Sequence, residues 1–208
     1  MSEIQKMPVM DTIKDGMGIG IKNIGTILVN LLLWILTCWI PYLNVGTTIG
    51  LYVGIISKAA KGEEISFTEI FNPLYRKYMG EYFLVTGLTC VGITIGFMFF
   101  VIPGIVISLA WFFAALITID KEKNPVEAIT VSNKITYGNK GRMFGILLLV
   151  SLIFFVILSI LTATVGFFDF GVVITALFLL IMLALVLFMC VIMIGIQASM
   201  YKQLASNI

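Results

Sequence analysis

Histidine is absent from this 208-residue chain, which removes the most common general base, proton shuttle and metal ligand. Only 3 cysteines occur, and Cys38, Cys90 and Cys190 each stand alone in an apolar run, which excludes a disulfide framework or a metal-binding spacing. Charged residues are scarce, at 12% against about 25% in an average soluble domain. The net charge of +2 gives no indication of a nucleic-acid partner.

The chain also lacks the motifs that mark nucleotide-binding or hydrolytic enzymes. It contains no Walker-type phosphate loop, no Gly-x-Ser-x-Gly element and no set of acidic residues and cysteines with metal-ligand spacing. Its long apolar stretches hold none of the ionisable residues that form the relay of a proton-driven pump. We therefore expect no catalytic residues, no cofactor and no bound metal.

Apolar sequence dominates instead, because 60% of the residues are hydrophobic and four long stretches carry no charge. These stretches are residues 23–57, 82–119, 143–168 and 170–201. A charge at the centre of a bilayer costs about 2.5–3.5 kcal/mol on insertion scales, so uncharged runs of this length are typical of membrane spans. The sequence predicts an all-α, polytopic membrane protein that forms a single domain over residues 1–208.

Each apolar region is interrupted by a short segment typical of a turn. The segments are 39–44 with Pro41, 101–104 with Pro103, and 164–171 with Gly166. They predict six transmembrane helices arranged as three hairpins. The expected helices are about 23–39, 45–60, 82–101, 104–120, 142–164 and 172–198, within hairpin units of about 8–60, 66–120 and 124–201.

The distribution of positive charge predicts the orientation. All 13 Lys and Arg lie in the N-terminal segment, the two long connecting loops and the C-terminal end. The positive-inside rule places these regions, and both termini, on the cytoplasmic side of the cell (inner or plasma) membrane. The second and fourth helices have only about 16–17 residues, or roughly 25 Å, against a hydrocarbon core of about 30 Å. They either span a thinned bilayer, with Lys58 and Lys61 reaching the interface, or belong to hairpins that dip in and return.

A short amphipathic helix at the membrane surface is expected before each hairpin. Before the first, apolar residues recur at every fourth position: Val9, Ile13, Met17 and Ile21. Residues 66–69, Ser-Phe-Thr-Glu, have the pattern of a capping box, and residues 124–127, Asn-Pro-Val-Glu, that of an N-cap followed by Pro and Glu. The unit of about sixty residues is thus repeated three times.

Five glycines and one amide are the candidate sites within the membrane. Small residues recur on one face of the second helix and one face of the third, at Gly46, Gly50, Gly54, Gly92 and Gly96. Small residues let helices approach closely in lipid, so these faces serve either helix packing or a groove for a lipid tail or a second copy. Asn30 lies deep in an apolar run and must bond to another helix, to water or to a bound substrate or ion.

Charged clusters mark the inner surface at residues 120–123, Asp-Lys-Glu-Lys, and at residues 140–142, Lys-Gly-Arg. Lys140 and Arg142 are candidates for binding anionic lipid headgroups, at about 1 kcal/mol per basic residue. The same charges also determine topology.

Loose motifs from Pro103 to Arg142 resemble a known family. They are Pro103-Gly104-Ile105, Trp111-Phe112-Phe113-Ala114, Asp120, Pro125-x-Glu127-Ala128, Ser132 and Tyr137-Gly138-Asn139. The segment from Gly50 to Phe71 and the closing 200–204 also fit. The pattern is similar to that of uncharacterised bacterial six-helix membrane proteins related to the membrane domain fused to some glycerophosphodiester phosphodiesterases. The resemblance implies an architecture, and the phosphodiesterase catalytic domain is missing, so hydrolysis is not implied.

Two functions remain open at this point. The first is a non-enzymatic scaffold or accessory protein that binds membrane lipids or other membrane components, alone, as a homo-oligomer or with a membrane protein partner. The alternative is a small transporter or exporter, including a self-immunity protein against a membrane-active peptide. The sequence does not identify the ligand.

Overall fold

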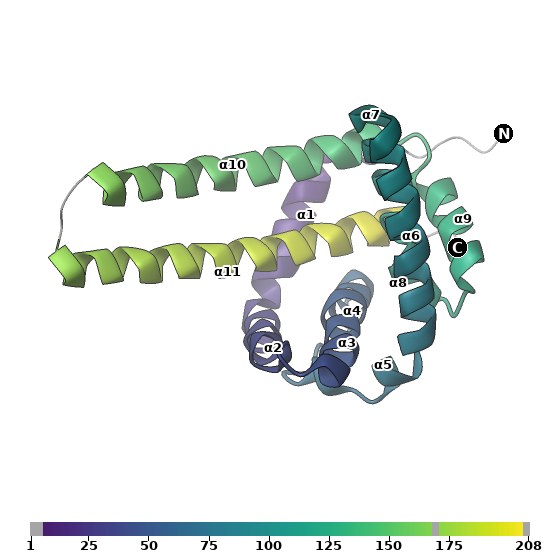
Figure 1. Cartoon of the computed structure of the whole chain (residues 1–208), viewed down its shortest axis with the longest axis horizontal. Helices are drawn as coiled ribbons and strands as arrows, with labels where there is room; N and C mark the ends of the chain where they lie inside the picture. Colours follow the sequence, from purple (N-terminus) through teal and green to yellow (C-terminus); the bar gives the residue numbers. More distant parts are fainter. Residues whose placement is uncertain (1–5, 168–170, 206–208) are drawn as a thin grey trace.

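The computed structural model describes residues 6–167 and 171–205, and within these ranges every regular element is a helix, without a β-strand. Residues 168–170 of the third expected turn lie outside the described residues, as do the first five and last three residues. The elements in chain order are α1 Val9–Lys22, α2 Ile24–Thr37, α3 Pro41–Ile49, the π-helix η1 Gly50–Gly54, α4 Ile55–Lys61, the 3₁₀ helix η2 Glu69–Phe71, α5 Leu74–Lys77, α6 Met79–Phe99, α7 Val101–Ala110, α8 Ala114–Asp120, α9 Pro125–Thr136, α10 Lys140–Phe167 and α11 Gly171–Leu204 (Figure 1).

Four segments of the described chain are long and apolar enough to cross a membrane. They are Met79–Phe99, Val101–Asp120, Lys140–Val165 and Gly171–Leu204. A fifth is obtained if α1 and α2, which meet at an angle of 73°, form one broken span. The all-helical class and several membrane-crossing segments therefore agree with the sequence prediction, while the short α2, α3 and α4 do not qualify individually.

Both prolines of the expected turns begin the returning helix instead of forming the turn. Ile40 is extended and Pro41 opens α3, where its missing N–H has no intrahelical role. Phe100 is extended between α6 and α7, and Pro103 lies in the first turn of α7. The reversals therefore come a residue or more before the expected positions, because proline fits the first turn of a helix.

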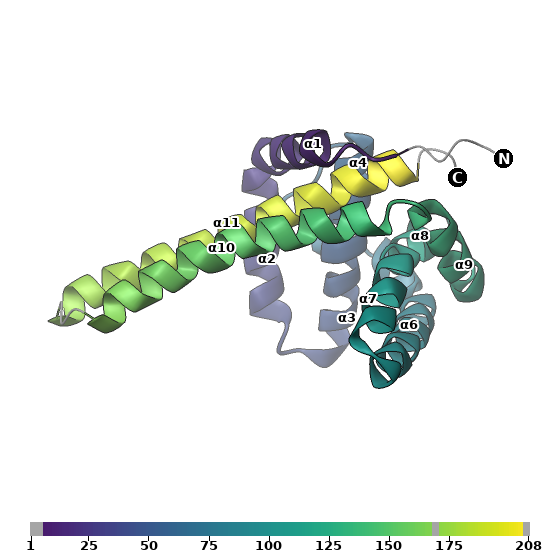
Figure 2. The same ribbon diagram turned by 90° about the horizontal axis from the view of Figure 1, so that it is seen from above.

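The helices do not form a single parallel bundle. Figure 2 shows the α2–α3 hairpin and the α6–α7 hairpin extending in a similar direction away from α1, whereas α10 and α11 extend together to the side. The outer halves of α10 and α11 expose large apolar side chains such as Phe155 and Val172. The inner end of α11 is buried from Val191 to Leu204, so it forms the centre of the packed body.

Glycines join α1 to α11. A Cβ at Gly16 would lie 2.6 Å from Ile196 Cα, and one at Gly20 would lie 2.9 Å from the Val191 carbonyl oxygen. A Cβ at Gly195 would collide with the backbone of α1. The predicted first surface helix is present as α1, but its buried face carries Thr12, Gly16 and Gly20, while Met17 and Ile21 of the apolar stripe are exposed.

The connection before the second hairpin differs from its prediction. The capping-box pattern at Ser66 and Glu69 is followed by one 3₁₀ turn and the four-residue α5, not by an amphipathic helix. Asn72 and Pro73 interrupt the backbone after that turn, because the residue before proline disfavours the helical region. The N-cap before the third hairpin is confirmed, since Asn124 Oδ1 accepts a hydrogen bond from the Glu127 N–H at 2.9 Å and Pro125 opens α9.

Candidate functional site

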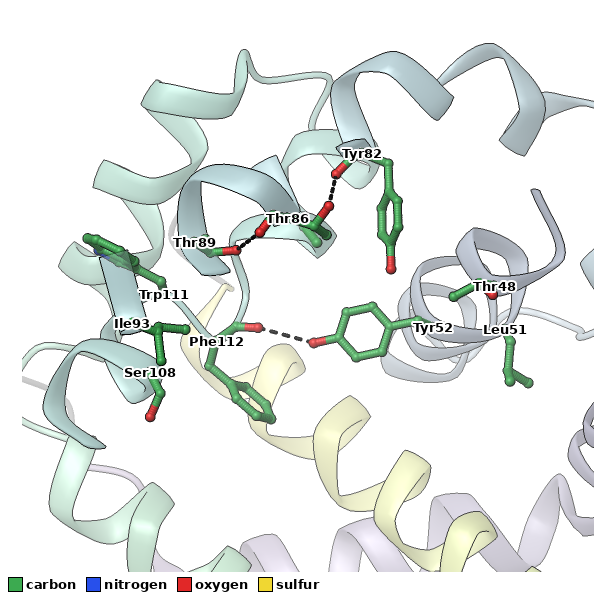
Figure 3. A pocket seen from close by; sticks show the side chains of 11 residues that line it. Thr48, Leu51, Tyr52, Tyr82, Thr86, Thr89, Ile93, Ser108, Trp111 and Phe112 are labelled. Carbon is green, nitrogen blue, oxygen red and sulfur yellow. Dashed lines mark hydrogen bonds between the residues drawn. The ribbon is translucent and has the colours of Figure 1, made fainter. Parts of the chain in front are cut away.

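A cavity of about 540 Å³ lies between three parts of the chain: α3 with η1, α6, and the junction of α7 with α8. We call it the aromatic cavity. Its lining residues are Thr48, Leu51, Tyr52, Tyr82, Thr86, Thr89, Ile93, Ser108, Trp111, Phe112 and Ala115. All of them are half-buried, as expected for side chains that border accessible space (Figure 3). Ligand pockets are commonly this large and this apolar, with a few polar groups.

Two interruptions of regular α-helix form walls of this cavity. The first is η1, where the predicted continuous helix 45–60 changes to a π-helix at Gly50–Gly54. The second is at residues 111–113, where the predicted helix 104–120 divides into α7 and α8. Within a membrane, irregular backbone is tolerated where it is buried in protein or lines a cavity, and π-helical turns occur frequently at functional sites.

The groups freed by the α7–α8 break are bonded by side chains. The Ser132 hydroxyl of α9 donates to the Ala110 carbonyl at 2.8 Å and accepts from the Phe113 N–H at 3.2 Å. Tyr52 crosses the cavity and donates to the Phe112 carbonyl at 3.2 Å (Figure 3). The break is thus held open by specific partners and is a fixed feature of the fold.

Hydroxyl groups on the cavity wall are largely turned to their own helices. Thr86 and Thr89 donate to the carbonyls of Tyr82 and Val85 at 2.6 and 2.8 Å, and Ser108 donates to that of Ile105 at 2.8 Å. Their O–H donors are therefore used within their own helices, which leaves the wall largely apolar. This surface suits an apolar chain better than a charged molecule.

A network of buried charges lies near the cavity, centred on Asp120 at the end of α8. Its side chain is 3% exposed and accepts hydrogen bonds from the Ser57 hydroxyl, from Lys61 Nζ at 2.5 Å and from the Tyr201 hydroxyl at 2.9 Å. These bonds connect α4, α8 and α11. The burial of Asp120 differs from the surface cluster expected from the sequence. Lys61 is 44% exposed, so its reach toward the interface stays a prediction.

Glu69 forms the second centre of buried charge. It is 2% exposed and accepts from Lys58 Nζ at 2.8 Å and from the Tyr75 hydroxyl at 2.6 Å. Burial by itself would raise the pKa of Glu69, but the hydrogen bonds from Lys58 and Tyr75 and the charge of Lys58 outweigh it and leave the pKa below its usual value. Burial and the Glu69 carboxylate together raise the pKa of Tyr75. Lys58 is therefore engaged in an ion pair and does not simply extend to the interface.

Asn30 is fully buried and all its described bonds go to backbone groups. Its Nδ2 donates to the Thr26 and Ser66 carbonyls, each at 2.8 Å, and its Oδ1 accepts from the Ile70 N–H at 3.1 Å. Asn30 thus fixes the segment 66–70 against α2. These backbone partners belong to the connecting segment, whereas the sequence analysis favoured a bond to another helix.

The predicted glycine faces contact mainly larger residues of other elements and not glycines on a facing helix. The face on α3 and η1 packs against the connecting segment: a Cβ at Gly50 would lie 2.6 Å from Ile70 Cα, and the Tyr75 ring occupies the space beside Gly54. Gly46 lies against Arg76. On α6, Gly92 accommodates the Trp111 ring and Gly96 lies against Ile107 and Gly104 of α7. The Gly50 face accordingly positions Tyr75, and the Gly92 face positions a cavity residue.

The two predicted lipid-headgroup residues lie together at the start of α10, and neither lines the aromatic cavity. Lys140 Nζ donates to Asn133 Oδ1 at 2.8 Å, and Arg142 is half-buried. Sequence reasoning missed the glycine contact of α1 with α11, although Gly16 and Gly20 have the four-residue spacing it used elsewhere. It also missed the role of Ser132 as the partner of a broken helix, although Ser132 is one of the residues that carry the family resemblance.

Comparison of the chain with protein-family models, with curated proteins and with solved structures gives no match in any of the three.

Proposed function

We propose that this chain is a non-enzymatic integral membrane protein that binds a membrane lipid, with an acyl chain of the lipid in the aromatic cavity. The observation that carries the proposal is the composition of the cavity wall, which is apolar, aromatic and lined by irregular backbone. Trp111, Phe112 and Tyr52 supply flat apolar surface, while Ile93 and Ala115 complete the wall. An acyl chain that enters from the bilayer is already in apolar surroundings, so van der Waals contact with these flat rings is what favours its binding.

Lipid retention by a cavity-filling variant tests the proposal. Ala115→Phe adds a ring to the cavity wall, and Ala184→Phe adds the same ring to an exposed position of α11. Both proteins and the wild type are purified in mild detergent, and bound lipid is counted by native mass spectrometry. We expect the wild type and Ala184→Phe to retain lipid and Ala115→Phe to lose most of it. Equal retention by the two variants would remove the aromatic cavity as the binding site.

The six-span arrangement belongs to the same proposal. It places α2, α3 with α4, α6, α7 with α8, α10 and α11 across the inner or plasma membrane as three hairpins with cytoplasmic termini. The charge distribution and the common direction of the first two hairpins support it (Figure 2). The third hairpin must then tilt toward the other two within the bilayer. The architecture is the one implied by the resemblance to the six-helix membrane family.

Cysteine labelling tests the orientation in a variant from which the native cysteines have been removed. Tyr42→Cys and Val172→Cys, both at exposed positions near expected outer turns, should react with an impermeant thiol reagent in intact cells. Glu64→Cys and Val126→Cys should react only after permeabilisation. External labelling of the second pair would reverse the proposed orientation, and mixed labelling within a hairpin would remove that hairpin from the span count.

Transport of the bound lipid is a second candidate, favoured by the α7–α8 break. Discontinuous membrane helices commonly form the substrate sites of transporters, because their ends leave backbone groups free. Here Ser132 and Tyr52 occupy those groups, which favours binding over transport. The rate at which labelled lipid moves between the leaflets of reconstituted vesicles distinguishes the two. If the protein is a transporter, the wild type gives a faster rate than Ala115→Phe. If it only binds lipid, the two proteins give the same rate.

A further inference from the structure

A second, charged pocket of about 300 Å³ is lined by residues that lie next to, or one turn away from, residues of the aromatic cavity. Each wall of the cavity continues into this pocket within about one helical turn, or roughly 6 Å along a helix. The neighbouring pairs, with the cavity residue first, are Tyr52 and Val53, Tyr82 and Tyr78, and Ala115 and Ile119. An apolar space and a charged space therefore follow one another along the same three elements, which is the layout that an amphiphile requires.

The charged pocket offers donors and acceptors of both signs. Two cationic side chains, Lys58 and Lys61, and three anionic ones, Glu63, Asp120 and Glu122, line it. The two lysine side chains are 30% and 44% exposed, and each ammonium has three donors, of which a buried carboxylate occupies one. The remaining donors are available to a phosphate oxygen.

Carboxylates supply the opposite sign at the pocket rim. Glu63 and Glu122 are exposed, and Glu122 accepts a hydrogen bond from the Tyr78 hydroxyl at 2.6 Å. Glu122 has a φ of 50°, a left-handed conformation that non-glycine residues adopt infrequently. Lys58 is paired with Glu69 and Lys61 with Asp120, so the carboxylates without a lysine partner are those of Glu63 and Glu122. They repel a purely anionic headgroup and favour one that carries a cation as well.

We infer that the charged pocket binds the headgroup of the lipid whose chain occupies the aromatic cavity, and that this headgroup is zwitterionic, with a phosphate and a primary amine. The phosphate lies against Lys58 and Lys61, and the ammonium donates to Glu122 and Glu63. A quaternary ammonium carries no N–H and cannot donate to these carboxylates, so phosphatidylethanolamine fits better than phosphatidylcholine. This inference rests on the proposed function, because the headgroup is located from the proposed position of the acyl chain in the aromatic cavity.

Competition between headgroups tests the inference. The purified protein is equilibrated with equal amounts of phosphatidylethanolamine, phosphatidylcholine and phosphatidylglycerol carrying identical acyl chains, and the bound species are counted by native mass spectrometry. We expect the wild type to prefer phosphatidylethanolamine. Glu122→Lys and Glu63→Lys each change the lining to three cations and two anions. Each should shift the preference toward phosphatidylglycerol by at least about fivefold, because it adds one basic residue near an anionic lipid and also removes a carboxylate.

The matched control is Glu64→Lys, the same charge change at an exposed neighbour that does not line the pocket. Its selectivity should equal that of the wild type. Suppose that the wild type retains lipid and Ala115→Phe loses it. If the three headgroups then bind equally, or if both charge reversals behave like the control, the headgroup inference is wrong and the proposed function stands. Equal binding of the ethanolamine and choline lipids would refute the role of the amine. If the wild type retains no lipid, both the inference and the proposed function fail.

Discussion

Replacing Asn30 by leucine should destabilise the protein more than the loss of one interhelical hydrogen bond would. The substitution preserves volume but removes the acceptor of the Ile70 N–H and a donor to the Ser66 carbonyl. Ser66 keeps a second partner, the Glu69 N–H at 3.2 Å, whereas Ile70 is 1% exposed and its N–H is left buried without its partner. An orphaned buried donor costs about 1–3 kcal/mol, and the lost bonds add about 1 kcal/mol, so the expected loss is about 2–4 kcal/mol.

The free energy of unfolding, measured by titration of mixed micelles with a denaturing detergent, checks this magnitude. Leu32→Ala, at a half-exposed position of the same helix, is the control and should change the stability much less. Hydrogen exchange gives a local measurement, because the Ile70 amide should exchange faster in Asn30→Leu than in the control. Hydrogen bonds inside bilayers are worth about 1 kcal/mol or less on average. A loss of unfolding free energy below that value, together with unchanged hydrogen exchange at Ile70, would refute the structural role of Asn30.

Three further substitutions test separate parts of the fold. Gly16→Ala places a Cβ against the backbone of α11 and should cost about 1–3 kcal/mol of unfolding free energy. Gly18→Ala, with open space around it, should be neutral or stabilising. Equal melting temperatures of the two variants would contradict the α1–α11 contact. Ser132→Ala orphans the Phe113 N–H and should cost about 1–3 kcal/mol, against less than about 0.5 kcal/mol for exposed Thr130→Ala in the same measurement. Because the pKa of Glu69 is lowered in the folded protein, its stabilisation is complete above the usual value of 4.5 and is lost as the pH falls through the folded pKa. Glu69→Gln should therefore show a shallower loss of stability below that pH, and a slope like that of the wild type would contradict the buried ion pair.

Local signals predicted most of the helical elements. Asn124 followed by Pro125 marked the beginning of α9, because both the side-chain cap and the fixed backbone angle of proline act within one turn. The same logic was wrong after Ser66, where a capping pattern led to a 3₁₀ turn. Glu69 does accept from the Ser66 N–H at 3.4 Å, and it also accepts from Lys58 and Tyr75, but Asn72 and Pro73 end the turn after three residues.

The candidate site was much less accessible to sequence reasoning. The glycines at 50 and 92 were recognised as close-packing positions, but their partners, Ile70 and Trp111, could not be named. Asp120 was grouped with the charged residues that follow it in the chain, at the inner surface. Its actual partners, Ser57 and Tyr201, are separated from it by 63 and 81 residues.

Composition and periodicity by themselves determined that this chain is helical and apolar enough to cross a membrane several times. Each residue contributes to that outcome independently, because transfer to lipid depends on the side chain and its immediate backbone. Only the tertiary structure decided that α1 packs on α11 through glycines, that α7 and α8 separate at a cavity, and that Asp120 and Glu69 are buried beside lysines. These features depend on pairs of groups far apart in the chain, whose burial is favourable only when hydrogen-bond partners from other elements arrive with them.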